Sequence, residues 1–420
     1  MAWPTLAVKF RHDSAWNDYV TSCHGFSIRR GQQRLLGRTQ PGTCVLTMDN
    51  SAGTFDPGYN ADCFIGQWVN ITSDSGSGAT SLFSGTIRDI KVTWDDPAAS
   101  TSVIECIDAL GLLAGITYPG TGTIPEGTLT ESAIEEILDI SMEADGPYST
   151  GIAWLTAMTT VGVVTQLMST ATGTALDIIQ KLVDGEGGFF FAAATATDAD
   201  PPVPAFYYLP PYVLYQANLY TYSDSATLGG SEFPYLFADL EGGTSDDFVY
   251  NKATATISRG VTNDDVQFEG GTAQTYTDTA SVDTYLVRPW SESGLWLADD
   301  SAALVRATQV VTKYKDPADF EIRRLVLDPH TVDTTAMWRN MELLGLALGK
   351  RVTVEKTPPY GSQKILECRV LGISHDVSNR AGSREWFVTL DLEDASRWPT
   401  TALKLDGVVG THILDTSVLG

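Results

Sequence analysis

The stretch from Gly37 to Pro57, GRTQPGTCVLTMDNSAGTFDP, constrains the fold more than any other part of the chain. At its centre, Thr43 to Met48 alternate between polar and apolar side chains, which is the period of a strand with one buried face. Gln40-Pro41-Gly42 precede this strand, and Asp49-Asn50 with Gly53 follow it. Such residues bond to their own backbone or tolerate a positive φ, so the chain reverses there. The stretch therefore predicts a β-hairpin.

Short strands of this kind recur through the first hundred residues, separated by turn formers such as Asp74 to Gly78. Six strands at this spacing are typical of a barrel or sandwich of about 100 residues. The one that ends at Trp94 is either an outward arm or a long edge hairpin. The predicted strands are Leu6 to Phe10, Phe26 to Arg30, Thr43 to Met48, Gln67 to Thr72, Ser81 to Trp94 and Ser102 to Ile107.

A first amphipathic helix is predicted over Thr128 to Met142, because apolar residues recur there at helical spacing. We expect its carboxylates to face solvent. They have no histidine or second carboxylate at ligand spacing, which argues against a metal site or an acid/base pair. These carboxylates are Glu131, Glu135, Glu136 and Asp139.

A second helix is predicted over Thr174 to Val183, with Thr174 as its N-terminal cap and Gly185 as its left-handed C-terminal residue. A strand, Phe189 to Ala193, follows. The glycines of residues 185–188 end a helix and open a strand, whereas a phosphate-binding loop does the reverse, so they form a turn.

The strand pattern returns after Asp247 and is interrupted by two helices. In the first of these, Ser301 to Tyr314, we expect Leu304 to lie on the buried side. The chain is therefore an α+β protein that is mainly β. The later elements are Tyr250 to Arg259, Ser301 to Tyr314, Ile322 to Leu327, Met337 to Leu348, Arg351 to Lys356, Ile365 to His375 and Glu385 to Leu392.

Composition limits the function. The 420 residues include 52 acidic and 27 basic side chains, a formal charge of −25, which would repel a polyanion. Sequence-specific nucleic-acid binding is therefore disfavoured. The charge has two remaining explanations: it keeps the protein soluble, or it lines a passage through which DNA slides without sticking.

The five cysteines, at positions 23, 44, 63, 106 and 368, are widely spaced and odd in number, so we expect buried free thiols rather than disulfides or a zinc site. The N-terminus lacks the layout of a signal peptide, and no apolar stretch reaches the roughly 20 residues of a membrane span. We expect a soluble protein made in a cytoplasm.

The sequence contains almost no motif that is typical of a catalytic site. The sequence has no His-Glu-x-x-His, no Gly-x-Ser-x-Gly and no phosphate loop before a helix. His375 could begin an enzyme hypothesis, but Ser374 and Asp376 point to the opposite face of its strand, and no nucleophile motif accompanies it. We expect a structural histidine, no catalytic, cofactor-binding or metal-binding residues, and no enzymatic activity.

Residues 201–222 are rich in proline and tyrosine. Exposed tyrosines are contact surfaces for proteins or sugars, whereas tyrosines on strands usually cover a core. This segment is the one place where a carbohydrate-binding or cell-wall-degrading function could reside.

The pattern Arg-x-x-x-Gly-x-x-x-Leu-x-x-Asp-Asn-x-x-Gly-x-Phe-Asp-Pro over Arg38 to Pro57 resembles the N-terminal domain of minor tail proteins from long-tailed bacteriophages, the baseplate or tail-hub family related to contractile-phage hubs. Further segments resemble later parts of this family in the same order. They are Phe83 to Ile87, Asp108 to Leu113, Ala175 to Phe190, Tyr250 to Arg259, Leu348 to Val354 and Val370 to His375.

The resemblance implies two tube-type β-barrel or sandwich domains flanking a mixed α/β insert. We place the first β domain at 1–115, the mixed domain with its aromatic insert at 116–244, the second β domain with helices at 245–400 and a C-terminal tail at 401–420. In the family, three subunits with two such domains each form a pseudo-sixfold ring.

The implied function is a virion protein of the tail tip that forms the hub ring at the distal end of the tail tube. It would line the DNA exit path with carboxylates, without binding the DNA specifically. Its expected partners are two further copies of itself, the distal tail protein, the tape measure protein and other tail-tip proteins. A hexameric distal tail protein is the alternative within the same class.

Overall fold

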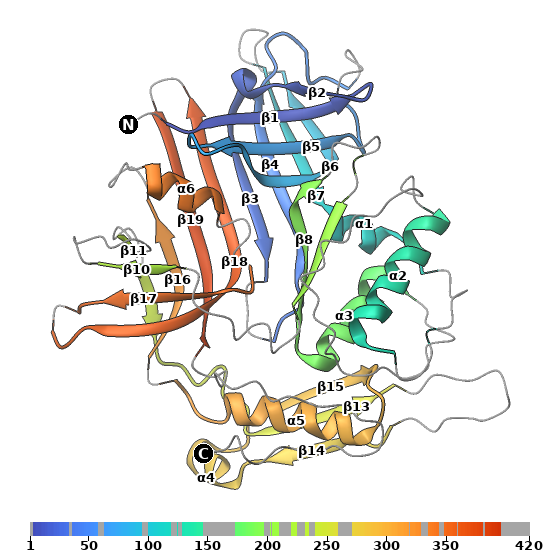
Figure 1. The fold of residues 1–420 in the computed structure, drawn as a ribbon, viewed down its shortest axis with the longest axis vertical. Coiled ribbons are helices and arrows are strands. Elements are labelled where there is room, and N and C mark those ends of the chain that lie inside the picture. Colours follow the sequence, from blue (N-terminus) through green and yellow to red (C-terminus); the bar gives the residue numbers. More distant parts are fainter. Residues whose placement is uncertain are drawn as a thin grey trace.

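A computed structural model gives the fold of the chain (Figure 1). It describes residues 3–32, 36–57, 63–94, 100–118, 124, 128–145, 173–196, 202, 204–209, 220–224, 232–234, 240–258, 271–318, 320–328, 335–343, 348–358, 360–380 and 383–395. The predicted C-terminal tail, 401–420, and most of the aromatic insert lie outside these residues.

The described strands of the first hundred residues form one antiparallel run, in the order β3-β4-β7-β6-β5-β1-β2. All six strands predicted there are present. Strand β6 pairs with β7 as far as Thr93, so the strand that ends at Trp94 is one side of a long hairpin. The strands are β1 (Thr5–His12), β2 (Ala15–Asp18), β3 (Cys23–Gly31), β4 (Gln40–Asp49), β5 (Trp68–Asp74), β6 (Thr80–Thr93) and β7 (Thr101–Asp108), with a 3-10 turn at Val20–Ser22.

The C-terminal strands extend the same sheet. β18 (Lys364–Arg380) pairs with β17 (Arg351–Lys356) and with β19 (Ser383–Asp394), and β19 pairs with β16 (Glu321–Leu327). Three short strands complete this end: β10 (Thr221–Ser223), β11 (Glu232–Pro234) and β12 (Leu240–Gly243). Helix α6 (Thr335–Leu343) lies against the N-terminal hairpin β5–β6.

Strands β3 and β18 join the two blocks. They pair antiparallel from Gly31 with Gly372 to Gly25 with Ser378, which makes one sheet of 14 strands among the described residues. One apolar core runs beneath the seam, since Phe26 and Ile28 belong to the same buried cluster as Val377. The N-terminal and C-terminal β segments are therefore parts of one continuous sheet (Figure 1).

The mixed region contains three helices beside the sheet, α1 (Ala109–Gly115), α2 (Thr130–Asp145) and α3 (Ala175–Glu186), and the pair β8 (Phe189–Ala196) and β9 (Pro204–Leu209) (Figure 1). Thr174 caps α3 as predicted, by accepting a hydrogen bond from the Asp177 backbone. The predicted C-terminal residue was wrong, because Gly185 is helical and the left-handed residue is Gly187, with φ 77°.

Helix α2 differs from the prediction at its first turn. Ile134, Ile137 and Leu138 are buried as expected, and Glu136 and Asp139 are exposed. Glu131, however, is buried rather than solvent-facing, and burial raises the pKa of its carboxyl. Glu131 lies on the side of α2 that packs inward, and the spacing of the apolar residues did not predict this burial.

A third unit is a three-stranded sheet, β14 (Gln274–Thr277), β13 (Lys252–Ile257) and β15 (Pro289–Leu295), with the short helix α4 (Thr279–Tyr285) and the longer α5 (Asp300–Tyr314). The Asp299 side chain caps helix α5 by accepting a hydrogen bond from the Ala302 backbone. Leu304 is 39% exposed, contrary to expectation, and Arg306 is buried instead. Arg306 stacks on the Trp290 ring at 5.5 Å, which explains why a charged residue occupies the inner side.

The predicted class, mainly β with helices, is confirmed. Of the expected barrels or sandwiches, a barrel is not confirmed, since the strands of the described residues form open, mostly antiparallel sheets and no closed barrel. Of the aromatic insert, Pro204–Leu209 forms β9 and Thr221–Ser223 forms β10. In the described part of the insert, Phe206, Tyr208 and Tyr222 are buried.

The stretch from Gly37 to Pro57 forms β4 and the turn after it. Gly42 lies where a Cβ atom would come within 2.5 Å of the buried Asp108 carboxylate. Asp108 in turn caps α1, and burial raises the pKa of its carboxyl to about 6, although Arg30 and the backbone of Gly42 lower it. The Arg30 guanidinium also donates to the Ala192 carbonyl of β8.

The turn after β4 is held by its own side chains. Asp49 accepts from the Ser51 backbone at 2.9 Å, and the buried Asn50 accepts from the Phe55 backbone at 2.8 Å. Gly53 has φ 70°, which allows the reversal. Phe55 enters the core, with its ring centroid 5.9 Å from that of Phe10. The Asp-Asn-x-x-Gly-x-Phe pattern thus directs the Phe55 ring into the core.

We predict that Gly42→Ala lowers the free energy of unfolding by about 1 to 3 kcal/mol, because the added methyl group displaces Asp108 from its cap and from Arg30. Gly115→Ala is the matched control, since Gly115 ends α1 with open space around it. Urea unfolding measures both. Equal stability of the two variants would contradict this account of Gly42.

Candidate functional site

The seam between β3 and β18 presents an open face. Along the register, Val45 of β4 lies beside Ser27 of β3, Ser27 beside Asp376 of β18, and Asp376 beside Phe387 of β19. Strand alternation places the neighbours of these residues in the core. The Ser27 hydroxyl donates to the Asp376 carboxylate at 2.6 Å, which fixes the register across the seam.

This face is hollowed into a depression of about 410 Å³. We call it the seam depression, and its lining includes His24, Ser27, Val45, Asp376, Glu385 and Phe387. The lining comes from both β blocks, so the depression exists only because β3 and β18 pair. Apolar, hydroxyl and carboxylate groups are mixed in it, which suits binding or passage more than bond-making chemistry.

Behind the depression, the histidine singled out in the sequence is structural. His375 is 1% exposed, and its Nδ1 accepts from the Trp386 indole N–H at 3.2 Å. Burial, with a further contribution from Arg30, lowers the pKa of His375 to about 3, so the ring is neutral and can accept this bond. Ser374 and Asp376 point to the other face, as predicted.

The five cysteines are buried free thiols, as predicted. Burial raises the pKa of Cys23 to about 11 and that of Cys63 to about 12. Thiolates are therefore scarce at neutral pH, and these side chains serve as small core residues. Within the described residues there is no group of three or more His, Cys, Asp or Glu side chains placed to hold a metal ion. Nor does any described helix have the length and apolarity to cross a membrane.

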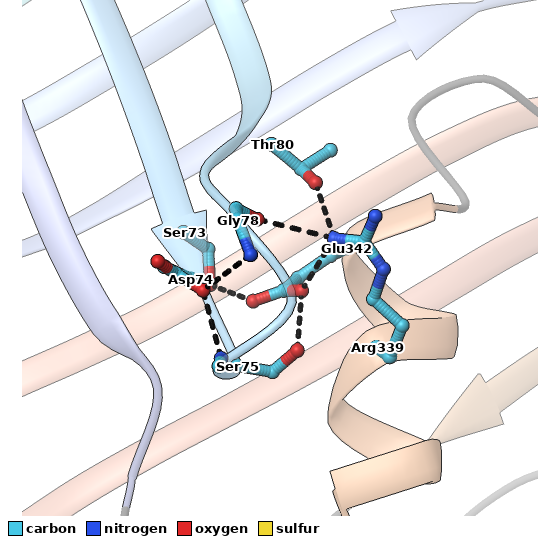
Figure 2. Close-up of polar contacts among 8 residues, drawn as sticks. Ser73, Asp74, Ser75, Gly78, Thr80, Arg339 and Glu342 are labelled. Atoms are coloured by element: carbon cyan, nitrogen blue, oxygen red, sulfur yellow. Dashed lines mark hydrogen bonds and ion pairs between the residues drawn. The ribbon is translucent and has the colours of Figure 1, made fainter.

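A polar clasp ties the two blocks together a second time (Figure 2). Glu342 of α6 is fully buried and accepts from the hydroxyls of Ser73 and Ser75, each at 2.7 Å. Arg339, one turn earlier, donates to the Thr80 hydroxyl at 2.8 Å and to the Gly78 carbonyl at 3.2 Å. We call these residues the α6 clasp.

The hairpin side of the α6 clasp is preorganised. Asp74 accepts from the backbones of Gly76 and Gly78 at 2.7 and 3.1 Å, which shapes the loop that carries Ser75 (Figure 2). Both glycines have φ 100°. The sequence predicted this loop only as a turn, because the residue it binds lies some 270 positions later in the chain.

Tryptophans pack beside the clasp. Trp338 of α6 lies 5.3 Å from Trp3 and 5.7 Å from Trp386 of β19, measured between ring centroids. These aromatic contacts bring together the first residues, α6 and the last long strand. The indole N–H of Trp386 is the donor to His375, so this tryptophan cluster extends to the histidine behind the seam depression.

A third junction contains paired charges. Asp184 of α3 accepts from Arg38 at 2.7 Å, and Glu292 of β15 lies 3.9 Å from Arg306 of α5. Burial raises the pKa of Glu292 to about 7; Arg306 opposes this shift, and Asp184 adds to it. This cluster connects the three-stranded sheet to α3 and to the β3–β4 loop.

We predict that Glu342→Ala lowers the free energy of unfolding by about 2 to 4 kcal/mol, because it leaves the buried Ser73 hydroxyl without its acceptor and removes the carboxylate that lies 3.4 Å from the Arg339 guanidinium. Glu136→Ala, which removes an exposed carboxylate on α2, is the control and should stay within about 0.5 kcal/mol of wild type. Urea unfolding gives both values. A Glu342→Ala variant as stable as the control would contradict the clasp.

A pH prediction follows from Glu292. Its pKa lies above the ordinary value of 4.5, so the folded state binds the proton more tightly, and stability declines as pH rises from about 4.5 to about 7. Glu292→Gln should reduce this decline by up to about 3 kcal/mol. Unfolding measured at pH 4.5 and 7.5 tests it, with Asp283→Asn on α4 as the exposed control. An unchanged slope in Glu292→Gln would refute the assignment.

Comparison of the sequence finds no matching protein-family model. No curated protein matches it either. Comparison of the fold does find similar structures. A tail protein from Neisseria meningitidis has a TM-score of 0.57 at 12% identity, with 94% of this chain and 98% of that chain covered. The 43 kDa tail protein of prophage MuSo2 from Shewanella oneidensis has a TM-score of 0.55 at 13% identity, covering 94% and 100%.

Both alignments extend over nearly the whole of each chain, so the likeness concerns the complete arrangement rather than one shared motif. It includes both β blocks and the units between them. The chain therefore has the fold of phage tail proteins, and the family resemblance carried by its motifs is confirmed at the level of the fold.

Proposed function

We propose that this chain is a structural protein of a phage tail and forms the hub ring at the distal end of the tail tube, without catalytic chemistry of its own. One observation carries the proposal: the β3–β18 ladder holds two β blocks in a single rigid sheet within each protomer. The shared fold with the Neisseria and Shewanella tail proteins supports the same class of function.

A ring of three copies would then present six β blocks, which matches the sixfold symmetry that the family resemblance implies for the tube. Closed rotational symmetry is the usual form of such assemblies. The α6 clasp and the Trp3–Trp338–Trp386 cluster support this role, because they keep the two blocks of one copy at a fixed angle.

We place the seam depression on the inner wall of the ring. Its rows carry Asp376 and Glu385, and Glu105 lies beside Val45 on the same face. Carboxylates along the wall would repel the phosphate backbone and let DNA pass without specific binding. The remaining surface would dock the distal tail protein, the tape measure protein and other tail-tip proteins in the virion.

The test is the symmetry of the purified or virion-bound assembly. We predict a particle of three copies by native mass spectrometry, and a threefold ring by cryo-electron microscopy in which Asp376 and Glu385 face the axis. Six copies would favour the hexameric distal tail protein instead. A monomer at all concentrations, or a ring whose wall is neutral or basic, would refute the proposal.

A further inference from the structure

The three-stranded sheet β14-β13-β15 has one face covered and one face open. Helix α5 packs on the covered face, where Ala253, Ala255 and Ile257 of β13 meet Ala307 and Val311. The residues of β13 between these three point the other way. They are Thr254 and Thr256, and both are partly exposed.

The strand register continues this pattern across the open face. Thr254 lies between Thr275 of β14 and Ser291 of β15, and the two threonine hydroxyls are 2.9 Å apart. The next row pairs Thr256 with Ser293. Thr277 lies beside Lys252 at the other end. We call this surface the hydroxyl face; it consists of Thr254, Thr256, Thr275, Thr277, Ser291 and Ser293.

The hydroxyl face carries no carboxylate among these paired positions, in a chain whose formal charge is −25. The one carboxylate of β15, Glu292, points to the covered side and lies near the buried Arg306. Lys252 adds a positive charge at the edge. Two copies of so acidic a protein repel each other, and contact through positions without carboxylates adds nothing to that repulsion.

An apolar loop borders the face. Leu286 and Val287, just before β15, are 75% and 54% exposed. Leu286 has φ 61°, a conformation that leucine rarely adopts. The fully buried Asn251 imposes it, because its side chain donates to the Leu286 carbonyl at 2.7 Å and accepts from the Arg288 backbone at 2.8 Å. The protein thus holds a strained backbone that presents two apolar side chains to solvent.

The chemistry of this surface favours a protein over a sugar or a nucleic acid. The aromatic residues of the sheet, Trp290 and Tyr276, both lie beside Ala253 and so point away from the hydroxyl face, although Tyr276 is 37% exposed on its own side. The hydroxyl face therefore offers no ring on which a sugar could stack. Leu286 and Val287 supply apolar area that a protein partner would bury, and none of the six residues of the hydroxyl face carries a charge that would have to be desolvated.

We propose that the hydroxyl face and the Leu286–Val287 loop form the surface on which a second copy of this chain docks during assembly. The choice of a second copy rests on charge, since self-repulsion is the constraint that a carboxylate-free face relieves. The inference rests on the proposed function, because it names the contact through which the ring would form.

The experiment uses the full chain and compares copy number over a concentration series by analytical ultracentrifugation. Thr254→Asp with Ser291→Asp places two carboxylates on the hydroxyl face, and we expect assembly at least ten-fold weaker. Ser132→Asp with Ser301→Asp adds the same charge at exposed positions in the first turns of α2 and α5, and should assemble like wild type.

Leu286→Gly is the second variant, and it tests the same surface in case the first variant does not fold. Glycine accepts the positive φ, so thermal unfolding should be unchanged or raised, while the loss of the apolar side chain weakens assembly. Weaker assembly in both face variants, with the control intact, supports the inference. Wild-type assembly that both variants retain overturns it and leaves the proposed function standing. A wild-type monomer at all concentrations overturns both.

Discussion

The antiparallel pairing of β3 with β18 is the interaction on which the rest of this structure depends. It joins residues 25–31 to residues 372–378, and in doing so it turns two β segments into one sheet with one core. The seam depression exists only at this junction. The helices α1 to α3 and the three-stranded sheet lie between β3 and β18 in the chain. The pairing of these two strands therefore brings the ends of this long segment together.

Buried polar groups are concentrated at the places where units of the chain meet. Arg30 and Asp108 lie between the sheet and the mixed region, Glu342 between α6 and the β5–β6 hairpin, and Glu292 near Arg306 and Asp184. Burying charge contributes little net stability, because desolvation offsets the attraction. Such groups instead specify geometry. Two apolar surfaces can slide past each other, whereas two hydroxyls bonded to one carboxylate allow a single relative position.

Local patterns in the sequence predicted the elements that local physics determines. The period of two predicted the strands of the first hundred residues, and Thr174 marked the start of α3. Tertiary packing decided the rest. Gly185 continues α3, Glu131 is buried and Leu304 is exposed because their neighbours in space differ from their neighbours in sequence. Short strands such as β2, β10 and β12 have too few residues to show a period.

The candidate site could not be assembled from the sequence at all. Ser27 and Asp376 are 349 positions apart, and no spacing rule connects them. The family motifs located one of the two strands that meet, since one motif covers Val370 to His375 within β18, whereas the motif over Arg38 to Pro57 covers β4, the neighbour of β3. The motifs did not predict that β3 pairs with β18, and this pairing creates the seam depression and joins the two β blocks.

The long separation between β3 and β18 also fixes the order in which the molecule can be made. On the ribosome, β3 emerges early and its outer hydrogen-bonding edge has no partner until residue 372 has been synthesised. Until then that edge is a template for the wrong strand, including one from another nascent chain. A product that ended before β18 would therefore be left with an edge prone to aggregation.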